Sequence, residues 1–348
     1  RTAGNKSPAG RSIGMTIRES LEQREEDYLS EFASRSRTSR GRLKQEVECD
    51  IRPAFQRDRD KILHCKAFRR LKDKTQVFLS PEGDHYRTRL THTLEVSQNA
   101  RTIAKALKLN EDLVEAIALG HDLGHTPFGH AGERALNRVC PIGFEHSQQS
   151  VRTVDRLERG GQGLNLTYEV RDGILNHQTI GKPHTLEGKV VRLSDKISYI
   201  HHDMDDAVRA GILREGDVPK EIRDVIGCTP SQRLDHFVHD IVTNSMGKND
   251  ICMSEPVAEA MKRMRRFMFE NVYQNPVAKS EEGKAEMLME TLYTHFMKNI
   301  DGLPEEFLNL LSEGEPREQV ICDYVGAMTD RFAIAVYEEI YIPKSWTL

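Results

Sequence analysis

The sequence lacks the features of disulfide-stabilised, zinc–thiolate and membrane-spanning proteins. Its six cysteines are scattered through 348 residues, and no two of them form a CxxC pair. This spacing favours reduced thiols in a reducing compartment. No apolar run approaches the roughly 20 residues of a transmembrane helix, and no signal-peptide core is recognisable. We therefore expect a cytoplasmic protein with no membrane contact.

An excess of charge of one sign is absent as well. The chain has 50 Lys and Arg against 54 Asp and Glu, a formal net charge of −4. Dedicated nucleic-acid binders usually carry a basic excess, so the balance disfavours that class. A local basic run from Arg52 to Lys74 fits a solvated helical face, the usual outcome for such a run.

Alternating strand patterns, internal repeats and low-complexity linkers are also missing, whereas helical periodicity recurs along the chain. The pattern predicts a charged helix or arm at 16–36 and helices near 89–108, 146–159, 168–178, 187–209, 231–245, 254–273, 281–299 and 316–340. In the 89–108 helix, Leu94, Val96, Ala100, Ile103 and Leu107 should face inward. Asn110 is the expected N-cap of the next helix, which Gly124 and Pro127 end. The prediction is one large all-α domain.

The stretch 119–133, LGHDLGHTPFGHAGE, concentrates titratable groups in a few turns. His121 follows Val114, Ile117 and Ala118 on the buried face of the predicted helix, where an imidazole without a partner would be costly. The site therefore needs partners from elsewhere in the chain.

His92, the adjacent pair His121–Asp122, and Asp195 are the candidate partners, each within a predicted helix. Two imidazoles and two carboxylates suit a divalent ion and leave room for water or a phosphate oxygen. Taken singly, His92 fits a buried histidine bonded to backbone, and Asp195 fits a cap or ion-pair partner. The combination H…HD…D favours a metal site.

Six segments extend this pattern into a family resemblance: FQRDRDKILHCKAFRRLKDKTQVF at 55–78, RTRLTHTLEV at 87–96, HDLGHTPFGHAGE at 121–133, GFEHSQQS at 143–150, RLSDKISY at 192–199 and ICDYVGAMTDRF at 321–332. The chain resembles the HD-domain phosphohydrolases, and more closely the deoxyguanosine triphosphate triphosphohydrolase-like family. We expect an HD-domain helical fold at 51–348 with its metal core at about 87–210, an N-terminal helical arm at 15–50, and an appended, non-native leader at 1–14.

The resemblance implies a function, a cofactor and partners. The reaction would cleave a dNTP, dGTP included, into a deoxynucleoside and inorganic triphosphate. One divalent metal per site is implied, Mn²⁺ or Mg²⁺, with iron, cobalt or nickel as alternatives. The implied partners are further copies of the chain, as a hexamer or tetramer, and a nucleotide effector or single-stranded DNA.

Roles for individual residues also follow from the resemblance. His125 matches the proton-donating histidine, His130 and Glu133 match a His/Glu pair that handles water, and His146 matches a histidine that contacts the reacting phosphate. The alternative for His130 or His146 is a supporting role beside the metal. The assignment of general acid and general base stays open.

Substrate contacts are implied at five positions. Arg89, Lys196 and Tyr199 match residues that bind the phosphates, and Gln76 and Asp203 match readers of the sugar 3′-hydroxyl. Tyr199 is also a candidate for rejecting a ribose. The HHDMDD run at 201–206 resembles a second metal site, but a solvated helix end is the favoured interpretation.

Two other classes of function remain open on the sequence. Another HD-type enzyme, a 5′-nucleotidase or a phosphodiesterase, would share the metal residues. A non-catalytic nucleotide- or nucleic-acid-binding protein would not need His125, His130 and Glu133.

Overall fold

The computed structural model describes residues 15–76, 87–274 and 281–344. Within these ranges the backbone forms helices and no β-strand, apart from two isolated bridges, Arg42 with Thr167 and Thr75 with Thr88. The all-α prediction is therefore confirmed. The predicted leader at 1–14 lies outside the described residues.

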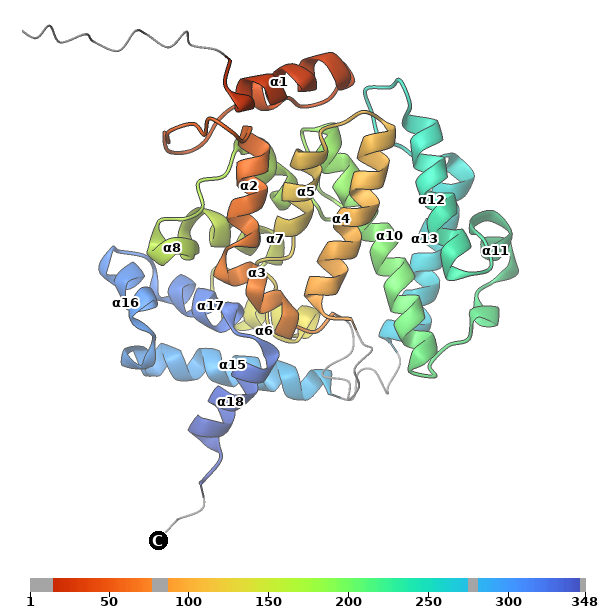
Figure 1. Ribbon diagram of the computed structural model, residues 1–348. Coiled ribbons are helices and arrows are strands. Elements are labelled where there is room, and N and C mark those ends of the chain that lie inside the picture. Colours follow the sequence, from red (N-terminus) through yellow and green to blue (C-terminus); the bar gives the residue numbers. More distant parts are fainter. Residues whose placement is uncertain (1–14, 77–86, 275–280, 345–348) are drawn as a thin grey trace, which may run out of the picture.

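The centre of the molecule is α5 (Glu111–Gly120). It is buried on nearly all sides and packs against α2 (Ala54–Leu63), α4 (Arg89–Ala106), α9 (Tyr168–Leu175) and α10 (Leu186–Arg209) (Figure 1). An apolar helix that is buried all round is held by the helices about it. Because α5 is held so firmly, the chain that leaves its C-terminal end is placed accurately inside the protein.

Other helices surround this centre. Beside α10 lie α12 (Pro230–Ser245) and α13 (Glu255–Met268), and α11 (Lys220–Ile226) packs against these two. A second apolar cluster forms among α6 (Gly129–Val139), α15 (Glu282–Lys298), α16 (Glu305–Ser312), α17 (Arg317–Ala327) and α18 (Asp330–Tyr341). The short helices are α3 (Lys66–Arg70), α7 (His146–Arg152) and α8 (Glu158–Gly161), and Figure 1 shows the blue C-terminal helices beneath the central ones.

The N-terminal arm is helical only in part. α1 (Ile17–Tyr28) begins with a capping box between Thr16 and Glu19 and ends well before the predicted residue 36. After α1, buried carboxylates attach the arm to the central helices through hydrogen bonds. Glu187 accepts from the backbone and hydroxyl of Ser34, each at 2.9 Å, and from the backbone of Asn110 at 3.1 Å.

The main helix predictions were close, with further local errors. Asn110 caps α5 by accepting from the Leu113 backbone at 3.2 Å. Leu94, however, is 48 % exposed, because the inward face of α4 carries polar site residues. The helix predicted at 316–340 is divided at Met328, and Thr329 starts α18 by accepting from Phe332 at 3.3 Å.

Two polar residues connect the chain just after α5 to the C-terminal helices. Lys74 is buried, and its side-chain nitrogen donates to the carbonyl oxygens of His125 and, at 3.1 Å, Gly326. Asp330 accepts from the backbone of Phe128 and of Thr75, each at 3.0 Å. The chain after α5 is thus fastened to the C-terminal helices.

Gly124 provides a stability test of this segment. An added Cβ would lie 2.2 Å from the backbone nitrogen of Ser150, which cannot move like a flexible side chain. Gly124→Ala should lower the free energy of unfolding by about 1–3 kcal/mol or more, as overpacking does. Gly216→Ala is the control, since nothing lies within 4 Å of its Cβ. Equal denaturant midpoints for the two variants would contradict the close approach.

Candidate active site

The end of α5 places His121 and Asp122 in the interior. His121 is the C-cap residue of α5, and Asp122 follows in the turn, not within a helix as the sequence suggested. Phe128 and Gly129 have φ values of 60° and 55°, and a Cβ on Gly129 would lie 2.9 Å from the Arg89 guanidinium. Glycine therefore allows the turn and this close approach together.

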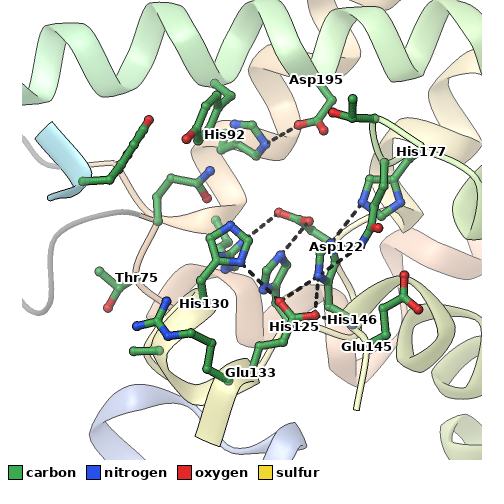
Figure 2. A pocket seen from close by; sticks show the side chains of 18 of the residues that line it. Thr75, His92, Asp122, His125, His130, Glu133, Glu145, His146, His177 and Asp195 are labelled. Atoms are coloured by element: carbon green, nitrogen blue, oxygen red, sulfur yellow. Dashed lines mark hydrogen bonds and ion pairs between the residues drawn. The ribbon is translucent and has the colours of Figure 1, made fainter. Parts of the chain in front are cut away.

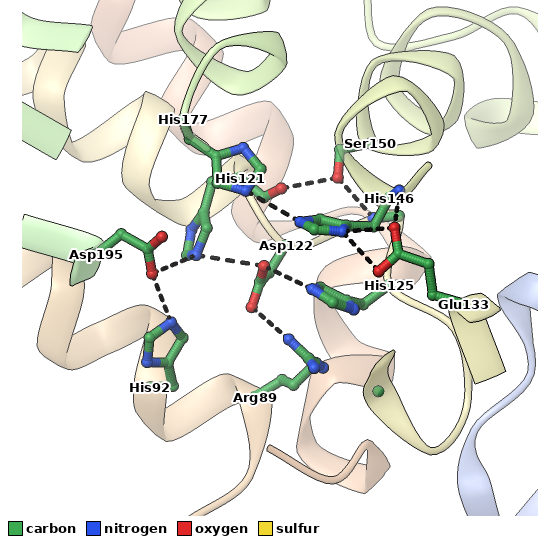
Figure 3. A network of polar contacts seen from close by, with 12 residues as sticks. Arg89, His92, His121, Asp122, His125, Glu133, His146, Ser150, His177 and Asp195 are labelled. Atoms are coloured by element: carbon green, nitrogen blue, oxygen red, sulfur yellow. Dashed lines mark hydrogen bonds and ion pairs between the residues drawn. The ribbon is translucent and has the colours of Figure 1, made fainter. Parts of the chain in front are cut away.

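The four candidate metal ligands converge from α4, the end of α5, and α10 (Figure 3). His92 Nε2 lies 3.1 Å from Asp195 Oδ1, and His121 Nε2 lies 3.8 Å from the same oxygen. Asp122 Oδ1 lies 3.4 Å from His121 Nε2. One ligand atom from each of His92, His121 and Asp195 lies within 4.8 Å of the others.

These four residues fit a divalent metal. His121 donates from Nδ1 to the Ala118 carbonyl at 2.6 Å, which leaves the lone pair of Nε2 aimed at the carboxylates. That buried Nε2 has no hydrogen-bond partner among the described residues. A buried nitrogen without a partner is costly unless something binds it. Two imidazole and two carboxylate donors form an open set of the kind found in hydrolytic metal sites.

Neighbouring imidazole and guanidinium groups hold both carboxylates ionised. Burial alone would raise the pKa of Asp122, but His121, His125 and Arg89 hold it well below its usual value. Arg89 donates to Asp122 Oδ2 at 2.9 Å. The pKa of Asp195 falls to about 2, because the hydrogen bond from His92 and the charges around it outweigh burial. Both groups are thus anions near neutral pH.

A second group of titratable residues lies next to the quartet (Figure 2). His125 stacks on His146 with ring centroids 3.9 Å apart. Glu133 accepts from His146 Nδ1, at 2.9 and 3.0 Å to its two oxygens, and from His130 Nδ1 at 3.2 Å. Burial, followed by the charges of Arg89 and His146, keeps the pKa of His125 well below its ordinary value. The sequence paired Glu133 with His130, but His146 is the buried and more closely held partner.

All these groups line or adjoin one cavity of about 660 Å³. Among the predicted substrate residues, Gln76, Arg89, Lys196 and Tyr199 line it. Asp203 does not, because it is fully buried and the hydroxyl of Tyr273 donates to it from the cavity wall. Tyr273 stacks on Tyr199 with ring centroids 5.5 Å apart.

Comparison with known proteins decides the family. Residues 89–200 match the HD domain, and residues 251–339 match the phosphohydrolase-associated domain. A deoxyguanosinetriphosphate triphosphohydrolase-like protein of Caldanaerobacter subterraneus is 56 % identical, over 95 % of this chain and 98 % of that protein. One from Desulfatibacillum aliphaticivorans is 49 % identical, over 94 % and 99 %. The chain belongs to the deoxyguanosinetriphosphate triphosphohydrolase-like family.

This membership makes the protein a metal-dependent phosphohydrolase of the HD type. The solved structure of a phosphohydrolase from Bacteroides thetaiotaomicron has a similar fold, with a TM-score of 0.50 and 16 % identity over 81 % of this chain and 67 % of that one. No helix in the described part of this HD protein is long and apolar enough to cross a membrane.

Several cavity residues of this HD phosphohydrolase had no signal in the sequence. His177, Gln178, Arg265 and Tyr273 line the cavity from segments that carry no recognisable motif. Of these residues, His177 would have been the easiest to find from the sequence, because it is a histidine just beyond an amphipathic helix. Arg265 and Tyr273 come from the far end of the chain, so only folding brings them to α10.

The HHDMDD run is not the solvated helix end that the sequence favoured. His202, Asp203 and Asp206 are buried. Arg87 donates to Asp206 at 3.0 Å, and His202 pairs with Glu95 at 2.7 Å. These contacts satisfy the charges internally and attach α10 to α4.

The basic run at 52–74 is largely neutralised within the chain. Arg59 pairs with Asp112 at 2.8 Å, Lys61 pairs with Glu46 at 2.9 Å, and Lys74 is buried. The structure therefore accounts for much of this charge through internal partners.

A measurement of metal binding can distinguish the four candidate metal ligands from the titratable residues beside them. Asp122→Ala should remove a ligand and lower metal affinity by more than about 100-fold, beyond the loss typical of supporting residues. Activity should disappear with the metal. His130→Ala should retain metal, because the His130 side chain is 62 % exposed and bonds only to Glu133.

The measurement is metal content by elemental analysis beside turnover. Stoichiometric metal and full turnover in Asp122→Ala would show that the quartet is misassigned.

Proposed function

We propose that the protein hydrolyses dNTPs, dGTP included, to a deoxynucleoside and inorganic triphosphate. The observation that carries this proposal is the meeting in one cavity of the metal quartet, the Glu133–His146 pair and uncompensated cations. The printed names of the relatives support this substrate class. A nucleotidase or phosphodiesterase would use the quartet but has less need for cations along a phosphate tail.

The metal would be held by His92, His121, Asp122 and Asp195. When bound, it supplies Lewis-acid polarisation of an α-phosphate oxygen and lowers the pKa of a bound water. Mn²⁺ or Mg²⁺ is the proposed ion, with iron, cobalt or nickel as alternatives. Arg89 keeps Asp122 ionised and in place for this role.

Proton transfer falls to the histidines beside the quartet. The leaving 5′ oxygen needs a proton from a group within hydrogen-bond reach. His125, the first candidate from the sequence, has a pKa well below its ordinary value because of burial and the charges of Arg89 and His146, so it is neutral near pH 7. His146, backed by the Glu133 carboxylate, is the better donor. His130 remains a candidate for orienting water at the cavity mouth.

Cations along one wall suit the phosphate tail. Lys196 and Arg265 line the cavity together with Asp195, and Lys196 makes no ion pair among the described residues. Burial, followed by the charges of Arg192 and Arg265, lowers the pKa of Lys196 to about 8. A polyphosphate would supply the negative charge that this wall lacks.

The sugar and base would occupy the rest of the cavity. Gln76 Oε1 is buried without a hydrogen-bond partner among the described residues, and it is the proposed acceptor for a sugar hydroxyl. Tyr199 and Tyr273 form a stacked wall of the cavity, and Tyr199 is the proposed residue for rejecting a ribose. Assembly as a homo-oligomer and activation by a nucleotide or single-stranded DNA remain predictions from the family.

A product assay tests the proposal directly. The protein is incubated with each dNTP and rNTP in Mg²⁺ or Mn²⁺, and the products are resolved by ion exchange. We expect deoxynucleoside and intact triphosphate. A nucleoside monophosphate with pyrophosphate, or orthophosphate alone, would assign another phosphohydrolase reaction. Binding without turnover under every metal would indicate a non-catalytic protein.

The pH dependence of KM tests the proposed role of the Lys196 charge in binding the phosphates. With its pKa lowered to about 8, Lys196 is cationic below that pH and loses its charge as the pH rises through it. KM for the dNTP should therefore rise above about pH 8. Lys196→Arg should remove that rise because arginine stays charged, and Lys196→Ala should raise KM at pH 7 by about 10-fold or more, the value of a charged hydrogen bond.

Lys189 is the matched control on the same helix. It pairs with Asp250 at 2.8 Å and does not line the cavity. Lys189→Ala should leave KM and its pH dependence unchanged. A KM that is independent of pH in the parent protein would exclude the proposed role of Lys196.

A further inference from the structure

A second cavity adjoins the reaction cavity, and the proposed hydrolysis of a dNTP leaves it unused. It encloses about 630 Å³ and is lined by residues of α10, of α13 and of the segments on either side of α13. That volume is in the range of sites for small organic ligands. The two cavities meet at a boundary of six residues that line both: Thr179, Lys196, Tyr199, Arg265, Phe269 and Tyr273.

The interior of the second cavity is apolar. Leu193, Ile251, Met253 and Met261 line it away from the boundary. Methionine side chains adjust to ligands of different shapes. At the boundary, Phe269 is 55 % exposed, so its ring is open to stacking with another planar group. This lining suits an aromatic group better than it suits a bare phosphate chain.

The charged residues of the second cavity all have one sign. Lys262 and Arg266 of α13 line it beside the two boundary cations, and no Asp or Glu of the described chain does so. Lys262 meets Glu259 at 3.7 Å, but both side chains are more than half exposed, and such a pair contributes little. The cavity is therefore suited to a ligand that is aromatic and also carries phosphate.

The order of groups along a bound dNTP determines which end reaches the boundary, and this step rests on the proposed function. Gln76, the proposed partner of the sugar, lines only the first cavity. Lys196 directly follows the candidate metal ligand Asp195, and Arg265 donates to the Thr179 hydroxyl at 3.4 Å at the boundary. A triphosphate that runs from the metal to Lys196 and Arg265 ends there, so its γ-phosphate faces the second cavity.

We propose that the second cavity binds an aromatic group esterified to the γ-phosphate, so that γ-substituted dNTPs are also substrates. Dinucleoside polyphosphates that contain a deoxynucleoside are members of this class. The chemistry at the α-phosphorus is unchanged. The oxygen of water bonds to the α-phosphorus, the bond to the 5′ oxygen breaks with its electron pair on that oxygen, and water supplies the proton that this oxygen gains. The products are a deoxynucleoside and a triphosphate monoester that keeps the aromatic group.

Two ligands allow binding to be measured apart from turnover. One is an analogue of dGTP in which a methylene group replaces the 5′ oxygen, so the bond to be cleaved is absent. The other is the phenyl ester of that analogue at its γ-phosphate. Their affinities for the protein in Mn²⁺ are compared by titration calorimetry. We expect the ester to bind at least as tightly, because burial of the ring offsets the charge that the terminal phosphate loses.

A variant that fills the second cavity tests where the ring is bound. Ala258 is an exposed residue of α13 that lines only this cavity. Ala258→Trp should weaken binding of the ester by about 10-fold or more, because the ring loses its apolar contacts. Binding of the unsubstituted analogue should not change. Ala258→Ser leaves the cavity open and is the matched control, in which both affinities should equal those of the parent.

The parent protein alone can contradict the inference. An ester that binds more than about 10-fold more weakly than the unsubstituted analogue would overturn it, as would binding of neither ligand. An Ala258→Trp variant that affects the two ligands equally would also overturn it, and equal weakening would place the base in the second cavity.

Turnover of dGTP and of its γ-phenyl ester is measured separately. We expect deoxyguanosine from both, with triphosphate from the first and phenyl triphosphate from the second. If the binding results match expectation but neither compound is cleaved, the second binding site stands and the proposed function fails. If dGTP is cleaved but the ester is not bound, the proposed function stands and this inference fails.

Discussion

The structure depends on the buried carboxylate of Asp122, which lies where both burial and the helix dipole oppose an anion. Asp122 follows directly after the C-terminal end of α5, where the partial charge of the helix is negative and opposes an anion. Arg89 at 2.9 Å, together with His121 and His125, overcomes both this field and the cost of burial. Removing the charge of Arg89 would leave an uncompensated buried anion, which typically costs about 3–5 kcal/mol. A divalent ion would contribute to the same balance.

The surrounding fold can be understood as support for that arrangement. The central helices hold α5, and the chain after it is tied through Lys74 and Asp330 to the C-terminal helices. Glu133, on α6, then reaches back to His146 on α7. The histidines around the cavity are therefore carried by packed helices or by turns with many backbone contacts, which suits chemistry that needs fixed distances.

Much of the site was predictable because its residues occur in short, recognisable segments. His92, His121, Asp122 and Asp195 were identified from type and spacing, and the structure brings them together. Asp203 was placed in the cavity because it lies two turns after Asp195, but helical spacing fixes only the direction of a side chain. It could not show that Tyr273, from a distant segment, covers that carboxylate. His177 was missed because one histidine without a motif has no distinctive pattern.

The amino-acid sequence by itself determined the all-α class, the central apolar helix, and the set of groups able to hold a metal and move protons. These properties follow from local periodicity and from the chemistry of each side chain. Only the tertiary structure decided which groups are paired: Glu133 with His146, His146 with His177, and Lys196 in no ion pair among the described residues. Protonation depends on burial and on the distance between charges, and those quantities exist only once distant segments have packed together.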